Sequence, residues 1–439
     1  MPPLGTPLTN TKFTLNTAGV AGLVGSKEAI SAMVAVYFYE HRRWLGWHNS
    51  PAGYSVAGCF GRFANSDFWQ RIFPGSGESL TVVLGLDGKQ GPKFVPFSFG
   101  KISDSQHLGY LAMERSKEVE TEGIPGPRAT TLSYVAYLDH TSSAELAVKQ
   151  LPLQKLDFFI AFIPIISSVV TCAMCAVFHD WVSFAAILIG ILAGGCASLV
   201  IGYGKLVVEC GKGPGGPGHG ILIEKNEIMV IKGQEQGTRV ITDGRFGIDY
   251  GGEATVLNHA IGFCSVLLFL QSTFQLLFVS QGTLFGQIMF LISVAVSWWF
   301  NACFSPREVE EIKTDILFEK LGNPEMRRFR TCTWTTNTVL ACLLLLHGQM
   351  LSSSDEDRRL IGLILRACIR DDAPAWQLWR EKVIKQLLNI GEKSQSLPYL
   401  VEDDAGKGEL SENGRELLQY LLEDARVAFE GYFEIRDKL

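Results

Sequence analysis

Residues 257–304 read LNHAIGFCSVLLFLQSTFQLLFVSQGTLFGQIMFLISVAVSWWFNACF, two long apolar runs joined at Gln281-Gly282. Each run has about 22 to 27 residues without Asp, Glu, Lys or Arg, long enough as a helix to span the ~30 Å hydrocarbon core of a bilayer. Because lipid offers no hydrogen-bond partners, the backbone of such a run must be satisfied internally, which requires a helix. The sequence therefore predicts a transmembrane helical hairpin over residues 254–304.

A second pair of apolar runs, 158–178 and 182–204, predicts another hairpin over residues 158–204. Pro164 is expected to bend its first helix, because proline removes one helical hydrogen bond. The predicted fold class is an α-helical polytopic membrane protein. It has four transmembrane helices in two hairpins, cytoplasmic β-rich segments and a helical C-terminal region.

The charges around the helix ends predict the orientation. The short turns at His179-Asp180 and Gln281-Gly282 contain no Lys or Arg, whereas Lys155, Lys205 and Arg307 flank the other helix ends. By the positive-inside rule, both termini and the segment between the hairpins are cytoplasmic. The N-terminal residues have neither a basic region nor an apolar core, so no cleaved signal peptide is expected.

The soluble parts of the 439-residue chain have distinct patterns. Strand-like runs at Leu80–Leu84, Lys93–Phe97 and Thr130–Leu138 indicate a β-rich N-terminal region, and alternating runs between residues 205 and 253, including TRVITDGRFGI, predict further strands. The predicted organisation is a soluble α+β or β-rich region (1–150), hairpin 1 (158–204), a cytoplasmic β-rich segment (205–253), hairpin 2 (254–304) and a cytoplasmic helical region (305–439).

Several further helices are predicted. Residues 26–47 form a helix whose apolar core is too short to span, so it is buried or lies on the surface; its basic and aromatic end suits lipid headgroups or an ordinary helix terminus. The capping box at Ser305–Glu308 starts a helix that Gly322-Asn323-Pro324 ends.

Residues 331–347 read as a buried or interfacial helix. The Trp376 and Trp379 stripe favours a core between helices, with membrane-surface contact as the alternative. A last helix is predicted over Leu417–Tyr432, after Ser411.

No pattern for catalysis or metal binding is convincing. Gly53–Ala57 imitates a nucleophile elbow around Ser55, with Asp139-His140 as conceivable partners, but a turn rather than a strand precedes it. Cys172 and Cys175 match C-x-x-C inside an apolar helix, and the ten cysteines form neither a disulfide framework nor a zinc pattern. The glycine run 211–220 lacks the order of a phosphate loop. We predict no catalytic, cofactor or metal residues.

Two sets of residues inside the membrane segments are candidates for a structural or binding role. Small residues at intervals of four, which allow close backbone approach, predict packing against another helix, with homo-oligomerisation as the alternative; they are Gly190, Gly194, Ser198 and Gly202. Gln275 and Gln287 lie at similar depth on either side of the turn. They predict an interhelical hydrogen bond or, alternatively, a polar substrate site.

The string Q-G-T-L-F-G-Q at 281–287, with Ser297-Trp298, Arg330-Thr331, Trp376 and Trp379, resembles a family of uncharacterised multi-pass membrane proteins of basidiomycete fungi. The resemblance covers residues 207–390, departs at Cys332-Thr333-Trp334 and does not extend to the first 150 residues. That family implies no activity.

The combined features favour an integral membrane scaffold or interaction protein. Its expected partners are the lipid bilayer and a protein or second copy bound through the cytoplasmic helices; the net charge of −6 argues against nucleic acid. A small-molecule transporter or channel is the alternative, although the helices carry no charged residue at mid-membrane. A membrane-tethered enzyme is third.

Overall fold

Two compact units make up the protein, and each is described by itself. The computed structural model describes residues 26–50, 53–62, 64, 67–74, 80–97, 101–124, 133–140, 155–210, 218–250, 254–303, 309–348, 355–390 and 410–438. The first unit comprises Met1–Gly88, Ala147–Val208 and Phe246–Lys313. The second comprises Lys89–Leu146, Glu209–Arg245 and Thr314–Leu439. Both are discontinuous in sequence, so segments far apart in the chain fold together.

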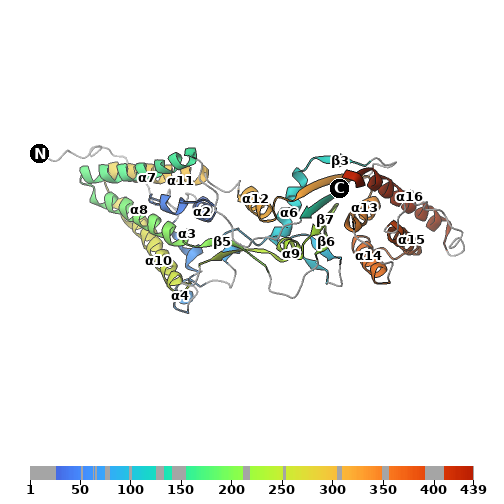
Figure 1. Cartoon of the computed structure of the whole chain (residues 1–439). Coiled ribbons are helices and arrows are strands. Elements are labelled where there is room, and N and C mark those ends of the chain that lie inside the picture. Colours follow the sequence, from blue (N-terminus) through green and yellow to red (C-terminus); the bar gives the residue numbers. More distant parts are fainter. Residues whose placement is uncertain are drawn as a thin grey trace. The chain divides into compact units, whose positions relative to one another are not determined.

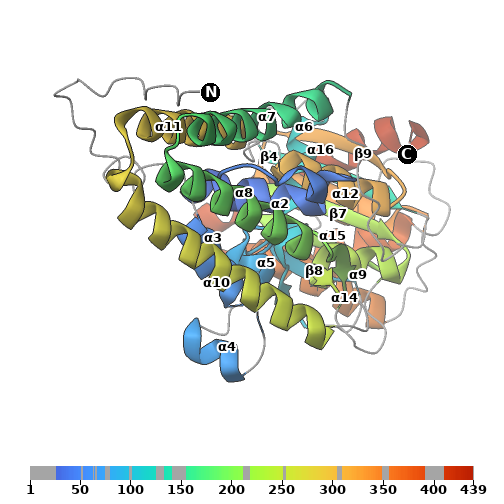
Figure 2. The ribbon, with the colours of Figure 1, turned by 90° about the vertical axis from the view of Figure 1, so that its left-hand side faces the viewer.

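Four long apolar helices dominate the first unit (Figure 1). They are α7 (Lys155–Val177), α8 (Trp181–Ile201), α10 (Ala254–Phe278) and α11 (Leu284–Cys303). All four are long and apolar enough to cross a bilayer, which indicates a membrane location and confirms the predicted helices. Among these four helices, the most extensive packing joins α7 to α11 and α8 to α10, as the two pairs of roughly parallel ribbons in Figure 2 show.

Short elements fill the remainder of the first unit. They are α2 (Ser26–Val34), η1 (Ala35–Tyr37), η2 (Arg42–Leu45), α3 (Gly53–Gly61), α4 (Asp67–Ile72), α5 (Leu80–Val83) and η4 (Val279–Gln281). α2 packs against α11, and α3 packs along α10. The predicted helix within residues 26–47 is therefore partly buried, and it ends in separate short turns. A two-stranded sheet of β5 (Lys205–Glu209) and β8 (Arg245–Asp249) follows α8 and precedes α10.

The predicted strand at Leu80–Leu84 is wrong, because Leu80–Val83 form the short helix α5. The amide of Leu86 donates to the Thr81 carbonyl at 2.8 Å, and Gly85 adopts a φ of 69°. A glycine in the left-handed region closes a helical turn at little cost. This local closure outweighs the strand propensity of the run.

A seven-stranded mixed sheet is the centre of the second unit. Its strands are β1 (Lys93–Pro96), β2 (Ser103–Asp104), β3 (Thr121–Gly123), β4 (Ser133–His140), β6 (His219–Glu224), β7 (Glu227–Gly233) and β9 (Glu325–Thr331). The order is β2-β1-β6-β7-β4-β9-β3. The β4–β7 and β3–β9 pairs are parallel and the other pairs antiparallel. The strands predicted near Lys93–Phe97 and Thr130–Leu138 are confirmed.

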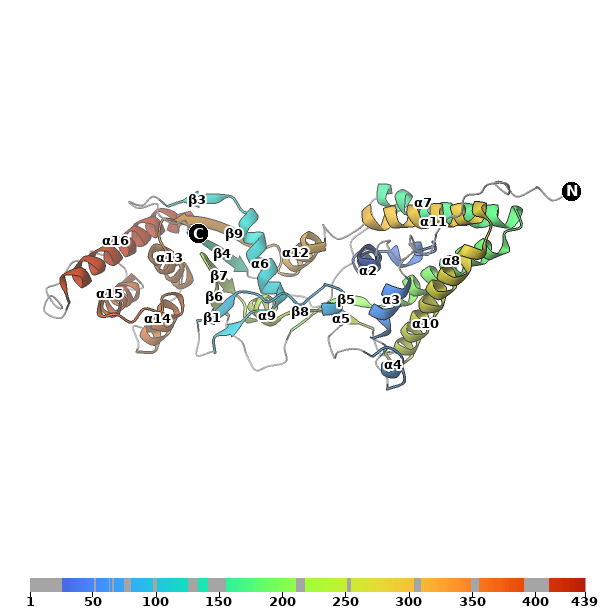
Figure 3. The ribbon, with the colours of Figure 1, turned by 180° about the vertical axis from the view of Figure 1, so that it is seen from behind.

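Helices cover both faces of this sheet, as Figure 3 shows. α13 (Trp334–Leu346) lies on one face, while α6 (His107–Glu118) and α9 (Glu235–Asp243) lie on the other side. Successive residues of β7, Ile228 to Ile231, are all buried, which fits a strand covered on both faces. α13 is the buried helix predicted at 331–347.

The predicted strand run TRVITDGRFGI is wrong for Thr238–Asp243, which belong to α9, and confirmed from Arg245 on, where β8 begins. Val240 and Ile241 are fully or nearly fully buried, and the Thr238 hydroxyl donates to the Gly218 carbonyl at 3.0 Å. Tertiary contacts with α6 and β7 thus override the β-branched composition of the segment.

Three outer helices complete the second unit: α14 (Asp355–Cys368), α15 (Pro374–Ile390) and α16 (Glu412–Ile435), the last followed by η5 (Arg436–Lys438). Trp379 is fully buried, and its indole N–H donates to the Leu421 carbonyl at 2.9 Å, so the predicted core between helices is confirmed. The predicted last helix is confirmed; it begins at Glu412, where the Ser411 hydroxyl accepts from the Gly414 amide.

α12 (Val309–Lys320) contains residues of both units. Gly322 and Asn323, with φ of 80° and 50°, end it at the predicted place. The capping box at Ser305–Glu308 and residues 211–217 of the glycine run lie outside the described residues.

Candidate functional site

A buried stretch without helical structure interrupts the short helices of the first unit. It runs from Gly46 to Ser50, after η2 and before α3. His48, Asn49 and Ser50 are all buried. Backbone groups in such a stretch have no helical partners, so they require acceptors and donors from neighbouring elements. We call residues 46–50 the inserted segment.

The face of α8 that carries the small residues receives this segment. A Cβ atom on Gly194 would lie 2.9 Å from the His48 carbonyl oxygen and 3.0 Å from that of Gly46. A Cβ on Gly46 would lie 2.2 Å from Cβ of Ser198. At Gly202, a Cβ would lie 2.6 Å from Cβ of Arg43. Three of the four predicted packing positions thus face the chain around the inserted segment rather than a long helix.

Gly190, the fourth position, opens space for a polar cluster. A Cβ there would lie 2.0 Å from Asn49 Oδ1 and 2.9 Å from Gln275 Nε2. Without that Cβ, Gln275 Nε2 donates to Asn49 Oδ1 at 2.9 Å and to the Ala186 carbonyl at 3.0 Å. The absence of a side chain at Gly190 allows α10 to bond both to α8 and to the inserted segment.

The cluster continues along α10 through Gln271. Its Nε2 donates to the Ser50 carbonyl at 3.0 Å and lies 3.4 Å from Gln275 Oε1. Gln271 and Asn49 are fully buried. Two atoms of the cluster, Asn49 Nδ2 and Gln271 Oε1, have no hydrogen-bond partner among the described residues. Such buried groups are where an ordered water or a small ligand commonly binds.

Helices α7 and α11 bind the segment from the other side. The Asn49 amide donates to Ser168 Oγ at 3.0 Å, and Ser168 Oγ lies 3.2 Å from Ser293 Oγ. His48 Nδ1 lies 3.1 Å from Ser297 Oγ. The inserted segment is therefore hydrogen-bonded to side chains from α7, α10 and α11.

His48 is uncharged at neutral pH. Burial lowers its pKa to about 3, and the positive charge of Arg42 acts in the same direction. Because the folded pKa lies below the ordinary value of 6.5, this histidine favours the folded state above about pH 6.5 and loses that contribution as the pH falls toward 3.

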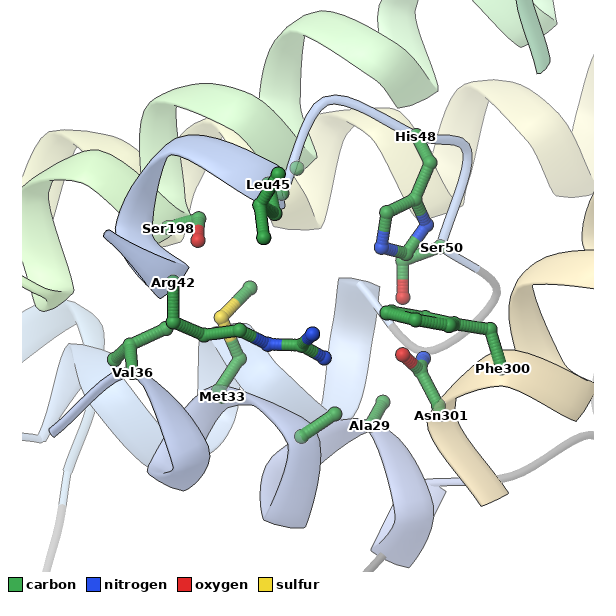
Figure 4. A pocket seen from close by; sticks show the side chains of 13 residues that line it. Ala29, Met33, Val36, Arg42, Leu45, His48, Ser50, Ser198, Phe300 and Asn301 are labelled. Atoms are coloured by element: carbon green, nitrogen blue, oxygen red, sulfur yellow. The ribbon is translucent and has the colours of Figure 1, made fainter. Parts of the chain in front are cut away.

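A small cavity borders the segment and is shown in Figure 4. The cavity volume is about 30 Å³, enough for about two water molecules. The Arg42 side chain extends along it, and the guanidinium carbon lies 4.6 Å from the centre of the Phe300 ring. Asn301 and Ser198 add polar atoms to the lining. Arg42 is 5% exposed, so the cavity holds a buried positive charge.

A second polar centre joins the two turns between the long helices. Asp180 caps α8 by accepting from the Ser183 amide at 3.0 Å. Its other oxygen accepts from the amide of Thr283 at 2.8 Å and from the hydroxyl of Thr283 at 2.6 Å. Gln287 lies at this end of the unit, where its Nε2 donates to the carbonyls of Ser280 and Gly282 at 3.2 and 3.0 Å. The two turns are thereby fixed to each other.

The structure gives the predicted polar pair separate partners. Gln275 bonds to the inserted segment and to α8, and Gln287 bonds to its own turn. Sequence reasoning also missed Arg42, Asn49 and Asp180 as participants. Only Asp180 left a legible signal, because an aspartate three residues before Ser183 at the start of an apolar run is a typical N-cap.

The other sequence candidates take no part in the hydrogen bonds described above. Ser55 lies inside α3 of the first unit, whereas Asp139 and His140 end β4 of the second, so the imitation of a nucleophile elbow has no strand–turn–helix context. Cys172 and Cys175 are free, buried thiols in α7. Among the described residues, no group of three or more His, Cys, Asp or Glu side chains could hold a metal ion.

Comparison of the chain with protein-family models, with curated proteins and with solved structures finds no match.

The first prediction concerns the contact at Gly190. We expect Gly190→Ala to lower the free energy of unfolding by about 1 to 3 kcal/mol, because the new methyl group must displace Asn49 and Gln275. Gly58→Ala in α3 is the matched control, since no atom lies within 4 Å of the place that its Cβ would take. We expect that change to be neutral or stabilising by up to about 1 kcal/mol. Unfolding in mixed detergent measures both, and equal losses would contradict the packing role.

The second prediction separates the two glutamines. A double-mutant cycle of Asn49→Ala with Gln275→Leu should show a coupling free energy of about 0.5 to 2 kcal/mol, because the two side chains share a hydrogen bond. The cycle of Gln275→Leu with Gln287→Leu should be additive within about 0.5 kcal/mol. The same unfolding assay gives both values. If Gln275 and Gln287 coupled more strongly than Asn49 and Gln275, the result would contradict this prediction and support the hydrogen bond between the two glutamines.

Proposed function

We propose that the protein is an integral membrane scaffold, anchored by the first unit and engaging a partner through the second. The four long helices cross the bilayer in two hairpins with both termini cytoplasmic. Large apolar side chains on these helices support insertion, since Phe159 is 70%, Val256 71% and Phe263 67% exposed. Exposed apolar surface on this scale is typical of a membrane or interaction face.

One observation favours a scaffold over a transporter. Buried amides and hydroxyls from three of the long helices hold the unit's own inserted segment, as the bonds of Gln275, Ser168 and Ser297 show. The same segment lies close against α8, since a Cβ atom added at Gly190 or Gly194 would come within 2.0 to 2.9 Å of its atoms. A carrier must rearrange around its binding site, and an interior bonded to itself in this way favours a rigid anchor.

The cavity beside Arg42 favours a second candidate, a carrier or channel for a small anion. A buried guanidinium among apolar helices is a common feature of solute pathways. His48, Ser198 and Asn301 line the same cavity and could share contact with an anion. The space of about 30 Å³ suits an ion rather than an organic solute.

The third prediction tests the threading. A glycosylation tag with flexible spacers, inserted at Gln281-Gly282, should be modified in the endoplasmic reticulum, because that turn lacks the basic residues that are retained on the cytoplasmic side. A tag at the C-terminus should remain unmodified. Electrophoretic mobility before and after glycosidase treatment measures this, and the reverse pattern would overturn the orientation.

The fourth prediction distinguishes scaffold from carrier through Arg42→Met. In a scaffold, replacing a buried charge by an apolar side chain of similar length is often tolerated. We therefore expect the variant to reach normal abundance in membranes and to restore whatever phenotype cells lose when the gene is deleted. Growth and abundance are measured together.

Arg43→Met is the matched control, because Arg43 neighbours Arg42 and its guanidinium lies 5.6 Å from the Trp44 ring, away from the cavity lining. If Arg42→Met is abundant yet inactive while Arg43→Met is active, the scaffold proposal fails and the carrier takes its place. If Arg42→Met does not accumulate, Ser198→Ala, which removes one polar atom from the cavity lining, replaces it in the same comparison.

A further inference from the structure

A groove in the second unit gathers arginine side chains. It lies between α14 and α15, which pack against each other at the outside of the unit (Figures 1 and 3). Its volume for water-sized spheres is about 540 Å³, within the range of sites for small organic ligands. Arg358, Arg359 and Arg366 line it from α14, and Arg380 lines it from α15. Four guanidinium groups therefore border one groove.

The sequence of α14 explains why these groups share the groove. Arg358 and Arg366 are eight residues apart, with Gly362 midway, so all three lie along one helix face. Gly362 contributes no side chain, and the nearest atom to its Cβ position is Ile384 Cδ1 of α15 at 3.7 Å. The glycine thus keeps the floor of the groove open between the arginines.

Arg380 is held in place before any ligand binds. Only 4% of it is exposed, and its Nη1 donates to Asp372 Oδ1 at 2.8 Å. Nη2 donates to the Asp371 carbonyl. Nε, by contrast, is buried and has no hydrogen-bond partner in the part of the chain that the structure describes. Through its other two nitrogens, the Arg380 side chain is therefore fixed at one edge of the groove by the protein itself.

The charge of the lining favours an anion. Glu381 is the only acidic residue that lines the groove among the described residues, against four arginines, of which Arg380 is paired with Asp372. Arg358, Arg359 and Arg366 are exposed and form no salt bridge or hydrogen bond with a described residue. Guanidinium groups bind phosphate oxygens in pairs of parallel hydrogen bonds. Their clustering creates a field that a phosphate group would neutralise.

We propose that this groove binds the phosphomonoester group of a small organic ligand. Arg358, Arg359 and Arg366 contact the phosphate oxygens, while Arg380 fixes one edge of the site. The phosphate is carried either by a lipid headgroup or by a soluble metabolite, which share this chemistry. The proposal rests on the second unit alone and does not depend on the scaffold function.

The fifth prediction uses the full-length protein in nanodiscs. Phosphatidic acid and soluble glycerol phosphate carry the same phosphomonoester with and without acyl chains. Binding of soluble glycerol phosphate is measured in phosphatidylcholine nanodiscs by calorimetry. Association with phosphatidic acid is measured by the quenching of tryptophan fluorescence with a headgroup-proximal quencher. We expect the double variant with Arg359→Gln and Arg366→Gln to bind the phosphate probe about tenfold or more weakly than the parent protein, in whichever arm the parent protein binds. Each lost guanidinium removes charge-assisted hydrogen bonds.

Arg370→Gln is the matched control, because Arg370 is also exposed near the end of α14 but does not line the groove. Binding in the soluble arm supports a metabolite, and binding only in the lipid arm supports a headgroup. Binding in neither arm overturns the proposal. Equal loss in Arg370→Gln, or equal association with phosphatidylserine, which carries a phosphodiester, overturns it in favour of unspecific charge attraction.

If the double variant is poorly folded, the single variant Arg359→Gln replaces it. Its circular dichroism and elution volume must match those of the parent protein. A properly folded Arg359→Gln protein that binds both probes as the parent does also overturns the proposal.

Discussion

The hydrogen-bonding requirement of the inserted segment determines the interior of the first unit. Residues 46–50 are not helical, yet they lie among apolar helices, where an unsatisfied backbone group costs several kcal/mol. Side chains of Ser168 and Gln271 supply partners for the Asn49 amide and the Ser50 carbonyl. Gln275 is thus placed by the segment that it holds, and this explains why it does not pair with Gln287.

The same constraint accounts for the small residues of α8. A straight helix can lie against another with ordinary side chains between them, but an irregular backbone with its own carbonyls needs more room. Gly194 faces two such carbonyls, and Gly190 faces the amide groups of Asn49 and Gln275. The glycine spacing predicted packing against another helix, whereas the element that lies against these glycines is the inserted segment from the N-terminal part of the chain. Asp180 provides a second fixed point at the turns.

In the second unit, burial on both faces of the sheet sets the arrangement. The middle of β7, Ile228 to Ile231, is buried, and α13 covers one face with side chains that are almost entirely inaccessible. At the edge of this core, Arg328 pairs with Glu227 at 2.6 Å across the strands and lies 4.3 Å from the centre of the Tyr134 ring. The outer helix α15 is anchored to α16 by the Trp379 indole, and α14 is anchored to α13 by the bond from the Trp334 indole to the Cys368 carbonyl. The other faces of α14 and α15 are free to carry charge, and the arginine groove forms there.

The sequence by itself determined the elements whose signals are local and strong. The four long helices follow from composition and length, α13 from its apolar run, and the end of α12 from Gly322 and Asn323. Only the tertiary structure decided short elements such as α5 and α9. The strand propensity of a few β-branched residues is too weak to outweigh the closure of a helical turn or the burial of a helix face. The tertiary structure also decided the partners of Gln275. Periodicity shows which residues share a face, but a hydrogen bond across 226 positions, from Gln275 to Asn49, depends on how distant segments fold together.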